Sequence, residues 1–206
     1  HVPLTEQPEY NGTQLIHSKV IASYLRQLLR NDLQYAPFRM EGMEQDVREM
    51  MEIDTPQGKL ALQIGGTIDR LDSKGDTLRI VDYKTGGTPK TPENIEQLFT
   101  PADNRPNYIF QTFLYAAILC RKQSLKVAPS LLYIHRAASE SYSPVIEMGA
   151  PRQPKVPVNN FAFFEDEFRE RLHGLLQEIF SQEETFSQTE DTRKCEYCDF
   201  RSLCKR

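Results

Sequence analysis

The sequence predicts an α/β fold in which a mixed central sheet is flanked by helices. Three short apolar or β-branched runs are typical of strands, at residues 60–64, 78–81 and 127–133. Three longer segments carry apolar side chains at helical spacing, at residues 13–31, 107–120 and 160–180. The chain has 206 residues, a length that fits one domain with a sizeable core.

The composition is ordinary for a soluble globular protein. No apolar run is long enough to cross a bilayer, so no membrane association is expected, and no signal-peptide pattern opens the chain. The net charge is −4. This charge neither indicates nor excludes nucleic-acid binding, because carboxylates at a metal site count as negative until metal binds and phosphate contacts need only a local basic patch.

The N-terminal third is expected to contain a linker, a helix and a strand. Residues 1–11 are polar and aperiodic, and we interpret them as a linker or expression remnant. The helix begins near Thr13, with Asn11 or Thr13 as its cap, and ends between Asn31-Asp32 and Pro37. Residues 38–53 then form one long strand or two strands broken at Gly42, with Glu44 as a solvent-facing charge.

The next two strands carry acidic residues at their ends. Residues 60–64 lead into Gly65-Gly66 as a mostly buried strand, and residues 73–76 supply hairpin turn chemistry before the strand at 78–81. If the two strands pair, Asp69 and Asp82 lie on neighbouring strands. Because strand side chains alternate, Asp82 and Lys84 are expected on one face and Tyr83 on the other.

Two carboxylates and a lysine that converge at strand ends have a definite chemical use. Carboxylate oxygens suit Mg²⁺ or Mn²⁺, and such an ion can activate a water and neutralise a phosphoryl oxygen. A neighbouring lysine can orient that water and stabilise charge. The competing interpretation is a surface hairpin with ordinary charges, since acid-x-lysine alone is common. The Gly-Thr-Ile before Asp69 and the Thr-Gly after Lys84 favour the functional interpretation.

The runs Gly66-Thr-Ile-Asp-Arg-Leu-Asp72 and Val81-Asp-Tyr-Lys-Thr-Gly86 together resemble the nuclease domain of the RecB and AddB type, within the PD-(D/E)xK superfamily. The resemblance extends from about Phe38 to the C-terminus. It implies a restriction-endonuclease-like core, with residues 12–190 as the nuclease domain and 191–206 as its cysteine-containing tail. It also implies that Asp69 and Asp82 bind the divalent metal, with the backbone carbonyl of Tyr83 as a further ligand, and that Lys84 is catalytic.

The segment after these strands contains a second family element. Residues 88–106 are a long excursion, in which nothing separates Lys90 or Arg105 from other exposed cations. In the helix at 107–120, Gln111 and Tyr115 are four residues apart and therefore share a face. RecB-type nucleases carry Gln-x-x-x-Tyr on the helix after the acid-x-lysine strand, so the resemblance implies that both residues border the catalytic site.

The C-terminal half is expected to complete the fold. After the buried strand at 127–133, residues 143–146 are candidates for an edge strand, 150–157 for a proline-rich connector and 160–180 for a long amphipathic helix. His135-Arg136 is expected to face solvent, and His173 is expected to be structural.

Three of the four cysteines, Cys195, Cys198 and Cys204, lie close together near the C-terminus. Their spacing lacks the fourth ligand of a zinc finger but resembles the end of AddB-like nucleases, in which such cysteines and one far upstream hold a 4Fe–4S cluster. The resemblance thus implies a cluster in the intact protein, against the alternative of free thiols. Cys120 is interpreted as a small buried hydrophobe and an unsuitable fourth ligand. This cysteine usage favours a reducing, cytoplasmic setting.

The resemblance also raises the question of a metal-site histidine, since RecB-type nucleases have a helix histidine near the metal. In that family it lies farther upstream than His17, which we interpret as a partly exposed helix residue. The chain is therefore expected to be a C-terminal fragment whose metal-site histidine lies outside it.

The sequence as a whole indicates a Mg²⁺- or Mn²⁺-dependent deoxyribonuclease, a phosphodiester hydrolase of the exonuclease or helicase–nuclease kind that acts in DNA repair or recombination. Its expected partners are DNA, as single strands or duplex ends, and a helicase subunit or fused helicase domain. One alternative is a non-cleaving DNA-binding or scaffold module of a helicase–nuclease complex. Another is a hydrolase of RNA or nucleotides on the same scaffold.

Overall fold

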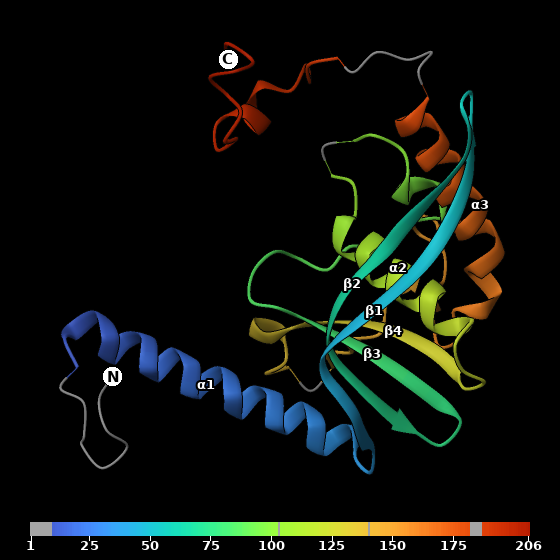
Figure 1. Ribbon diagram of the computed structural model, residues 1–206. Coiled ribbons are helices and arrows are strands. Elements are labelled where there is room, and N and C mark those ends of the chain that lie inside the picture. The colour runs from blue at the N-terminus through green and yellow to red at the C-terminus, as the bar shows by residue number, and fades with distance from the viewer. Residues whose placement is uncertain (1–9, 103, 140, 182–186) are drawn as a thin grey trace.

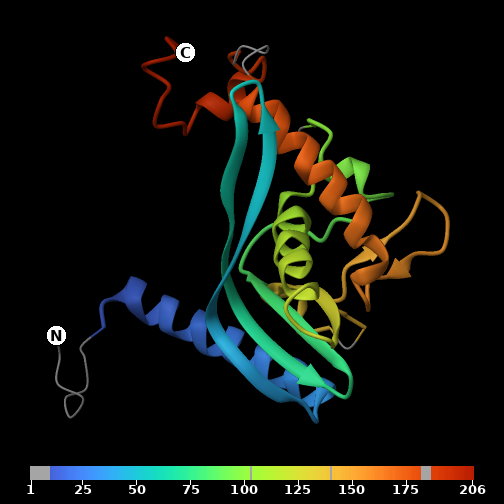
Figure 2. The ribbon, with the colours of Figure 1, turned by 45° about the vertical axis from the view of Figure 1, so that its right-hand side comes forward.

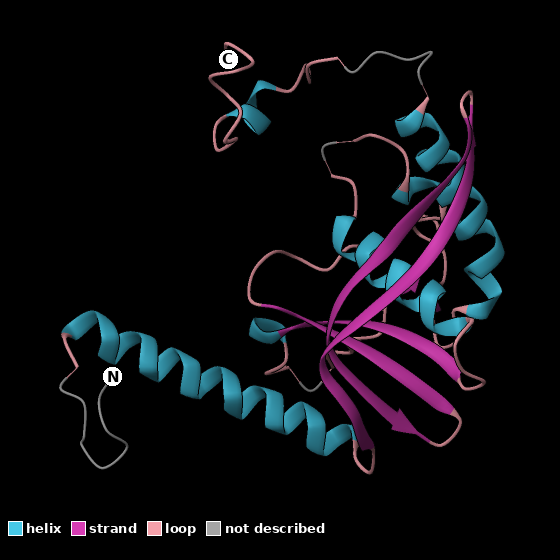
Figure 3. Ribbon diagram, in the orientation of Figure 1, coloured by secondary structure: helices cyan, strands magenta, loops and turns pink. Residues whose placement is uncertain are grey.

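The computed structural model describes residues 10–102, 104–139, 141–181 and 187–206. It confirms the predicted α/β fold: a four-stranded mixed sheet is flanked by three helices, consistent with a restriction-endonuclease-like core (Figures 1 and 3). The expected linker at residues 1–11 lies mostly outside the described residues. In chain order the elements are α1 (Gly12–Tyr35), β1 (Arg39–Thr55), β2 (Gly58–Lys74), β3 (Thr77–Lys84), η1 (Glu96–Leu98), α2 (Asn107–Cys120), β4 (Lys126–Tyr133), η2 (Ile134–Arg136), β5 (Glu147–Met148), β6 (Val156–Pro157), α3 (Ala162–Phe180) and η3 (Thr192–Cys195).

The sheet has the strand order β1-β2-β3-β4. The first two pairings are antiparallel and the pairing of β3 with β4 is parallel, with Lys84 opposite Tyr133. The predicted turn between β2 and β3 is confirmed, since only Gly75 and Asp76 separate these strands and Gly75 has a φ of 62°. Glycine adopts this left-handed conformation without the steric cost that other residues pay.

The β1-β2 hairpin is longer than predicted. β1 is one strand from Arg39 to Thr55 that continues through Gly42, where the register shifts after Met40. β2 contacts β3 only through residues 70–74, so the hairpin extends beyond the other strands (Figure 2). The prediction of a mostly buried strand at 60–64 is therefore wrong: Leu60 is exposed and Leu62 and Ile64 are half-buried, because β1 is the one strand paired with this half of β2.

Helices cover both faces of the sheet. On one face α2 lies on the strands with α3 beside it, and an aromatic cluster of Phe113, Phe161 and Phe168 fills the core between them. On the other face the C-terminal half of α1 packs Tyr24 and Leu28 against a smaller cluster that includes Val81 and Leu132. The sheet is therefore buried on both sides around β3, the strand that carries Asp82 and Lys84.

The helix α1 begins and ends for identifiable reasons. The Asn11 side chain accepts a hydrogen bond from the Gln14 backbone, and the Gln14 side chain accepts one from the Asn11 backbone, which is a capping box. The helix continues to Tyr35, within the range predicted for its end, and its C-cap is Ala36, the residue before Pro37.

The predicted edge strand at 143–146 is wrong. Within the described residues, Val145 forms one isolated bridge to Ser130, and the local sheet consists of β5 and β6 instead. β6 includes Pro157, a residue of the segment predicted as a connector. Among the described residues, none of the helices combines the length and apolar character needed to span a membrane.

Candidate metal centre

Asp69 and Asp82 come together where β2 and β3 separate. The last backbone pair between these strands is Arg70 with Val81. Beyond it, the backbone N–H of Tyr83 donates to Oδ2 of Asp69 at 2.8 Å. The side chain of Asp69 thus takes the place of a strand carbonyl and is fixed beside the end of β3.

Asp82 and Lys84 form the second half of the site. Lys84 Nζ lies 2.6 Å from Asp82 Oδ2, so the prediction that these side chains share a face of β3 is confirmed. Asp82 is only 5% exposed. Burial raises the pKa of its carboxyl group, the charge of Asp69 raises it further, and the Lys84 ammonium opposes both.

The donor set fits a hard divalent cation. Asp82 Oδ2 is buried and, within the described residues, accepts no hydrogen bond of normal geometry, so the Lys84 ammonium is its ionic contact. A second cation would relieve the repulsion between the two carboxylates. No group of three or more histidine, cysteine, aspartate or glutamate side chains in the described part of the chain is arranged to hold a metal. Two carboxylates and a backbone carbonyl agree with Mg²⁺ chemistry, in which waters complete the coordination.

Tyr83 points to the opposite face of β3, as predicted, into a network of buried charges. Its hydroxyl accepts from Nη1 of Arg70 at 3.1 Å, and the same Nη1 donates to both oxygens of Asp32 on α1 at 3.0 and 2.8 Å. Arg70 Nε and the Arg79 guanidinium donate to Asp72, at 2.8–3.0 Å. This network joins α1, β2 and β3 directly behind the two acids.

Gln111 and Tyr115 interact as their spacing predicts: Gln111 Nε2 donates to the Tyr115 hydroxyl at 3.0 Å. Gln111 is exposed, whereas Tyr115 is only 4% exposed. The Tyr115 ring rests on β2 at Gly66, where an added Cβ would lie 2.6 Å from the hydroxyl oxygen. This contact brings α2 to β2 three residues before Asp69.

Tyr108 is a neighbour of the site that the sequence analysis did not single out. Its ring lies under Lys84 Nζ, 4.2 Å from the ring centroid. A cation over an aromatic face is attracted by the ring quadrupole. Its position three residues before Gln111 on the helix after the acid-x-lysine strand is the signal that could have identified it.

The remaining candidates lie away from the acids or have other partners. His17 is exposed in the N-terminal half of α1, and the N-terminal end of this helix extends away from the sheet (Figure 1). Glu44 is exposed on β1, and His135 and Arg136 are also exposed. Lys90 donates to the carbonyls of Asn104 and Arg105 within the 88–106 excursion, and Arg105 lies over the Phe110 ring.

The tail cysteines lie in and after η3. Cys195 ends η3 and is half-buried, as is Cys204, whereas Cys198 is exposed. Within the described residues, no group of three or more histidine, cysteine, aspartate or glutamate side chains is arranged to hold a metal in this region, and the iron–sulfur cluster that the resemblance implies stays a prediction. Cys120 is half-buried on α2 against the core, as predicted, and burial raises the pKa of its thiol to about 11, with a further contribution from Glu165.

The family model described as the PD-(D/E)XK nuclease superfamily matches residues 3–205. No curated protein matches the chain. Members of this superfamily are generally nucleases that use a divalent metal, most often Mg²⁺, which agrees with the donor set at the end of β3. The chain belongs to the PD-(D/E)XK nuclease superfamily.

Proposed function

We propose that this chain is the divalent-metal-dependent deoxyribonuclease domain of a RecB/AddB-like exonuclease or helicase–nuclease. The observation that carries the proposal is the convergence of Asp69, Asp82 and Lys84 where β2 and β3 separate. The family accounts for the phosphodiester substrate and for the metal. A role in DNA repair or recombination, a helicase partner, a cytoplasmic setting and a longer parent protein follow from the motif resemblance and belong to the proposal.

Asp69, Asp82 and the backbone carbonyl of Tyr83 would hold Mg²⁺ or Mn²⁺. When bound, the ion supplies Lewis-acid chemistry, which lowers the pKa of a coordinated water and neutralises charge on the phosphoryl group. The residues fit this task because Asp69 is fixed by the Tyr83 amide and Asp82 by Lys84. Both carboxylates are therefore held in place before metal and substrate arrive, which lowers the cost of organising the site.

Lys84 is the catalytic cation. Its ammonium lies between Asp82 and the Tyr108 ring, so it is held at a defined point of the site and keeps donors for a water or a phosphate oxygen. From this point it orients the attacking water and stabilises the negative charge that develops on the phosphate.

Gln111 and Tyr115 organise the site from α2. Tyr115 is wedged against Gly66, and its hydroxyl holds the Gln111 amide. The exposed Gln111 is then available to a DNA strand that approaches the acids. In this proposal Tyr115 positions Gln111, and Gln111 contacts the substrate.

Residues 12–190 are proposed as the nuclease domain, and residues 191–206 as the cysteine-containing tail of the same domain. Cys195, Cys198 and Cys204 would supply three thiolates to a 4Fe–4S cluster in an intact protein that provides the fourth ligand. Anaerobic purification of the longer protein tests this assignment. Iron, sulfide and visible charge-transfer absorption that are lost together in Cys198→Ala would support it, and their absence from the unmodified protein would contradict it.

The activity is tested by incubating the protein with linear single-stranded DNA, blunt duplex DNA, RNA and free nucleotides, each with Mg²⁺, Mn²⁺ or EDTA. The proposal expects cleavage of DNA that EDTA abolishes. Cleavage restricted to RNA or nucleotides would favour the alternative hydrolase. DNA binding without cleavage of any substrate would favour the scaffold module.

A further inference from the structure

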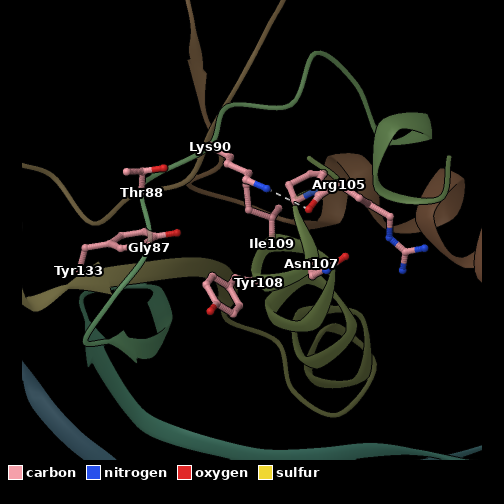
Figure 4. Close-up of a pocket in the computed structure, with 9 residues that line it drawn as sticks. Gly87, Thr88, Lys90, Arg105, Asn107, Tyr108, Ile109 and Tyr133 are labelled. Atoms are coloured by element: carbon pink, nitrogen blue, oxygen red, sulfur yellow. Dashed lines mark hydrogen bonds between the residues drawn. The ribbon is translucent and has the colours of Figure 1, made fainter. Parts of the chain in front are cut away.

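A pocket opens beside the proposed catalytic lysine. It has a volume of about 330 Å³ and is lined by residues that follow β3, precede and begin α2, and end β4: Gly87, Thr88, Lys90, Arg105, Pro106, Asn107, Tyr108, Ile109 and Tyr133. Figure 4 shows Gly87, Tyr133 and Tyr108 together on one side of this pocket and Lys90 across from them. Since the Tyr108 ring also contacts Lys84, the pocket and the catalytic site share a wall.

Two tyrosine rings and a glycine define that side of the pocket. A Cβ built on Gly87 would lie 3.6 Å from Cε2 of Tyr108 and 3.8 Å from Cε1 of Tyr133. The glycine thus leaves open a space that faces both rings, and its φ of 80° disfavours any other residue. Tyr133 is buried and stands opposite Lys84 in the sheet register, which fixes the second ring beside the site.

The charged residues of the lining argue against a phosphate as the occupant. The Lys90 ammonium already donates to the carbonyls of Asn104 and Arg105, at 2.8 and 3.1 Å. Figure 4 shows the Arg105 guanidinium directed away from the other lining residues, and its partner is the Phe110 ring. Aromatic rings with polar groups at the rim, such as Thr88 and Asn107, suit a flat heteroaromatic group with a polar edge.

We propose that this pocket binds the nucleobase of the nucleotide adjacent to the scissile phosphate, with Tyr108 as its stacking surface and as the positioning residue of Lys84. The inference rests on the proposed nuclease function, because the phosphate held at Asp69, Asp82 and Lys84 places the neighbouring base within reach of Tyr108. One side chain thereby links base binding to the orientation of the catalytic lysine. Stacking tolerates any base, so the pocket would position DNA without strong sequence preference.

The test measures binding separately from cleavage. Short single-stranded DNA is bound in EDTA, with one abasic residue placed at each position in turn, and affinities are compared by fluorescence anisotropy. The unmodified protein should lose affinity about 5- to 100-fold at one abasic position. Tyr108→Ala should abolish this difference, Tyr108→Phe should retain it because the ring remains, and both variants should keep the melting temperature of a folded domain.

Tyr10→Ala is the matched control, since Tyr10 is 48% exposed and Tyr108 45%, and Tyr10 lies next to the start of α1. It should bind like the unmodified protein. An abasic penalty of equal size in the unmodified protein and Tyr108→Ala, or no penalty in either, would overturn the pocket assignment. Cleavage assays on the same oligonucleotides separate the two proposals: cleavage without a Tyr108-dependent base effect leaves the nuclease standing, and a base effect without cleavage leaves the pocket standing.

Discussion

At the scale of single residues, the site is organised around one lysine that has two partners. Lys84 is paired with the buried Asp82 carboxylate and lies over the ring of Tyr108. The ion pair compensates the buried carboxylate of Asp82. The contact with the Tyr108 ring fixes the position of the Lys84 ammonium group in the site. Removal of this charge affects the substrate phosphate and Asp82 together.

Lys84→Met is expected to reduce DNA cleavage by about 10²–10⁴-fold, because the water loses its orienting donor and the phosphate its stabilising charge. The variant should still unfold cooperatively, since methionine fills most of the space of the lysine side chain, and its affinity for DNA should fall far less than its rate of cleavage, since one phosphate contact is lost. Steady-state cleavage and anisotropy measure the two effects. Lys59→Met, at the exposed end of the hairpin, is the control and should behave like the unmodified protein. Loss of folding in Lys84→Met would contradict a catalytic role.

A second residue-scale prediction concerns the charges behind the site. Asp72 is fully buried and accepts hydrogen bonds from Arg70 and Arg79. Asp72→Asn would leave the buried Arg79 guanidinium without a carboxylate and Arg70 with Asp32 alone, and should lower the free energy of unfolding by about 3–5 kcal/mol. Urea denaturation measures the change. Asp54→Asn, on the exposed hairpin, is the control and should change the free energy of unfolding by less than about 0.5 kcal/mol. If Asp72→Asn and Asp54→Asn destabilised the protein equally, the buried charge network would not contribute to stability.

The sequence was sufficient to group Asp82 with Lys84, because alternation along β3 fixes which side chains share a face, and the expected hairpin put Asp69 on the neighbouring strand. It could not reveal the Asp32–Arg70–Tyr83 contact, since Asp32 lies 38 positions before Arg70 and reaches it only after α1 has packed on the sheet. Tyr108 was missed for a similar reason. Its spacing of three residues from Gln111 could have placed it on the same helix face, but its contact with Lys84 exists only once the fold brings α2 to the end of β3.

At the scale of elements, the contact between α2 and β2 brings Tyr115, and with it the hydrogen-bonded Gln111, to β2 three residues before Asp69. Tyr115 fits against the bare backbone of Gly66, so the helix approaches more closely than a strand residue with a side chain would allow. The Gly-x-x-Asp spacing on β2 and the Gln-x-x-x-Tyr spacing on α2 are therefore parts of one packing arrangement.

Gly66→Ala tests this arrangement. The added methyl group would overlap the Tyr115 hydroxyl and ring, so the variant should lose about 1–3 kcal/mol of unfolding free energy. If it still folds, its cleavage rate should fall about a hundredfold as Gln111 is displaced. Gly174→Ala is the control: a Cβ there meets nothing on α3, and the change should stabilise the protein by about 0.5–1 kcal/mol. Unchanged cleavage by Gly66→Ala would argue against a role for Gln111.

The existence of the main helices and strands and the bounds of α1 could be predicted, whereas the length of the hairpin could not. The strand at 60–64 has the apolar pattern of a buried strand, yet it extends past β3 and stays partly exposed. Whether an apolar run is buried depends on where its neighbours end. The predicted strand at 143–146 failed for a similar reason. Its residues pair with the sheet through one bridge, from Val145 to Ser130, and this pairing depends on the tertiary structure.

At the scale of the whole molecule, the cysteines fall into two classes. Cys120 belongs to the core, with a pKa of about 11 that results from its burial and the nearby Glu165. The three tail cysteines are exposed or half-buried and lie apart from the sheet (Figure 1). In the metal-free chain, the tail thiols should therefore react faster with thiol reagents than the thiol of Cys120.

At pH 8 the tail thiols should react with Ellman's reagent well before Cys120. A thiol with a pKa of about 11 is ionised to only about one part in a thousand at this pH, and the thiolate is the reactive form. Raising the pH toward 11 should accelerate Cys120 selectively, and denaturant should release it at once. Mass spectrometry of the labelled peptides identifies each site. Four thiols that react at one rate would contradict the burial of Cys120.

The central claim is that Asp69, Asp82 and Lys84 form the metal-dependent nuclease site of this fold. The most direct measurement is the Mn²⁺-dependent cleavage of linear single-stranded DNA by the unmodified protein, Asp82→Ala and the exposed control Asp54→Ala. The account predicts cleavage by the unmodified protein and by Asp54→Ala, and none by a folded Asp82→Ala. Cleavage by Asp82→Ala at the rate of the unmodified protein would contradict the account and place the chemistry elsewhere in the molecule.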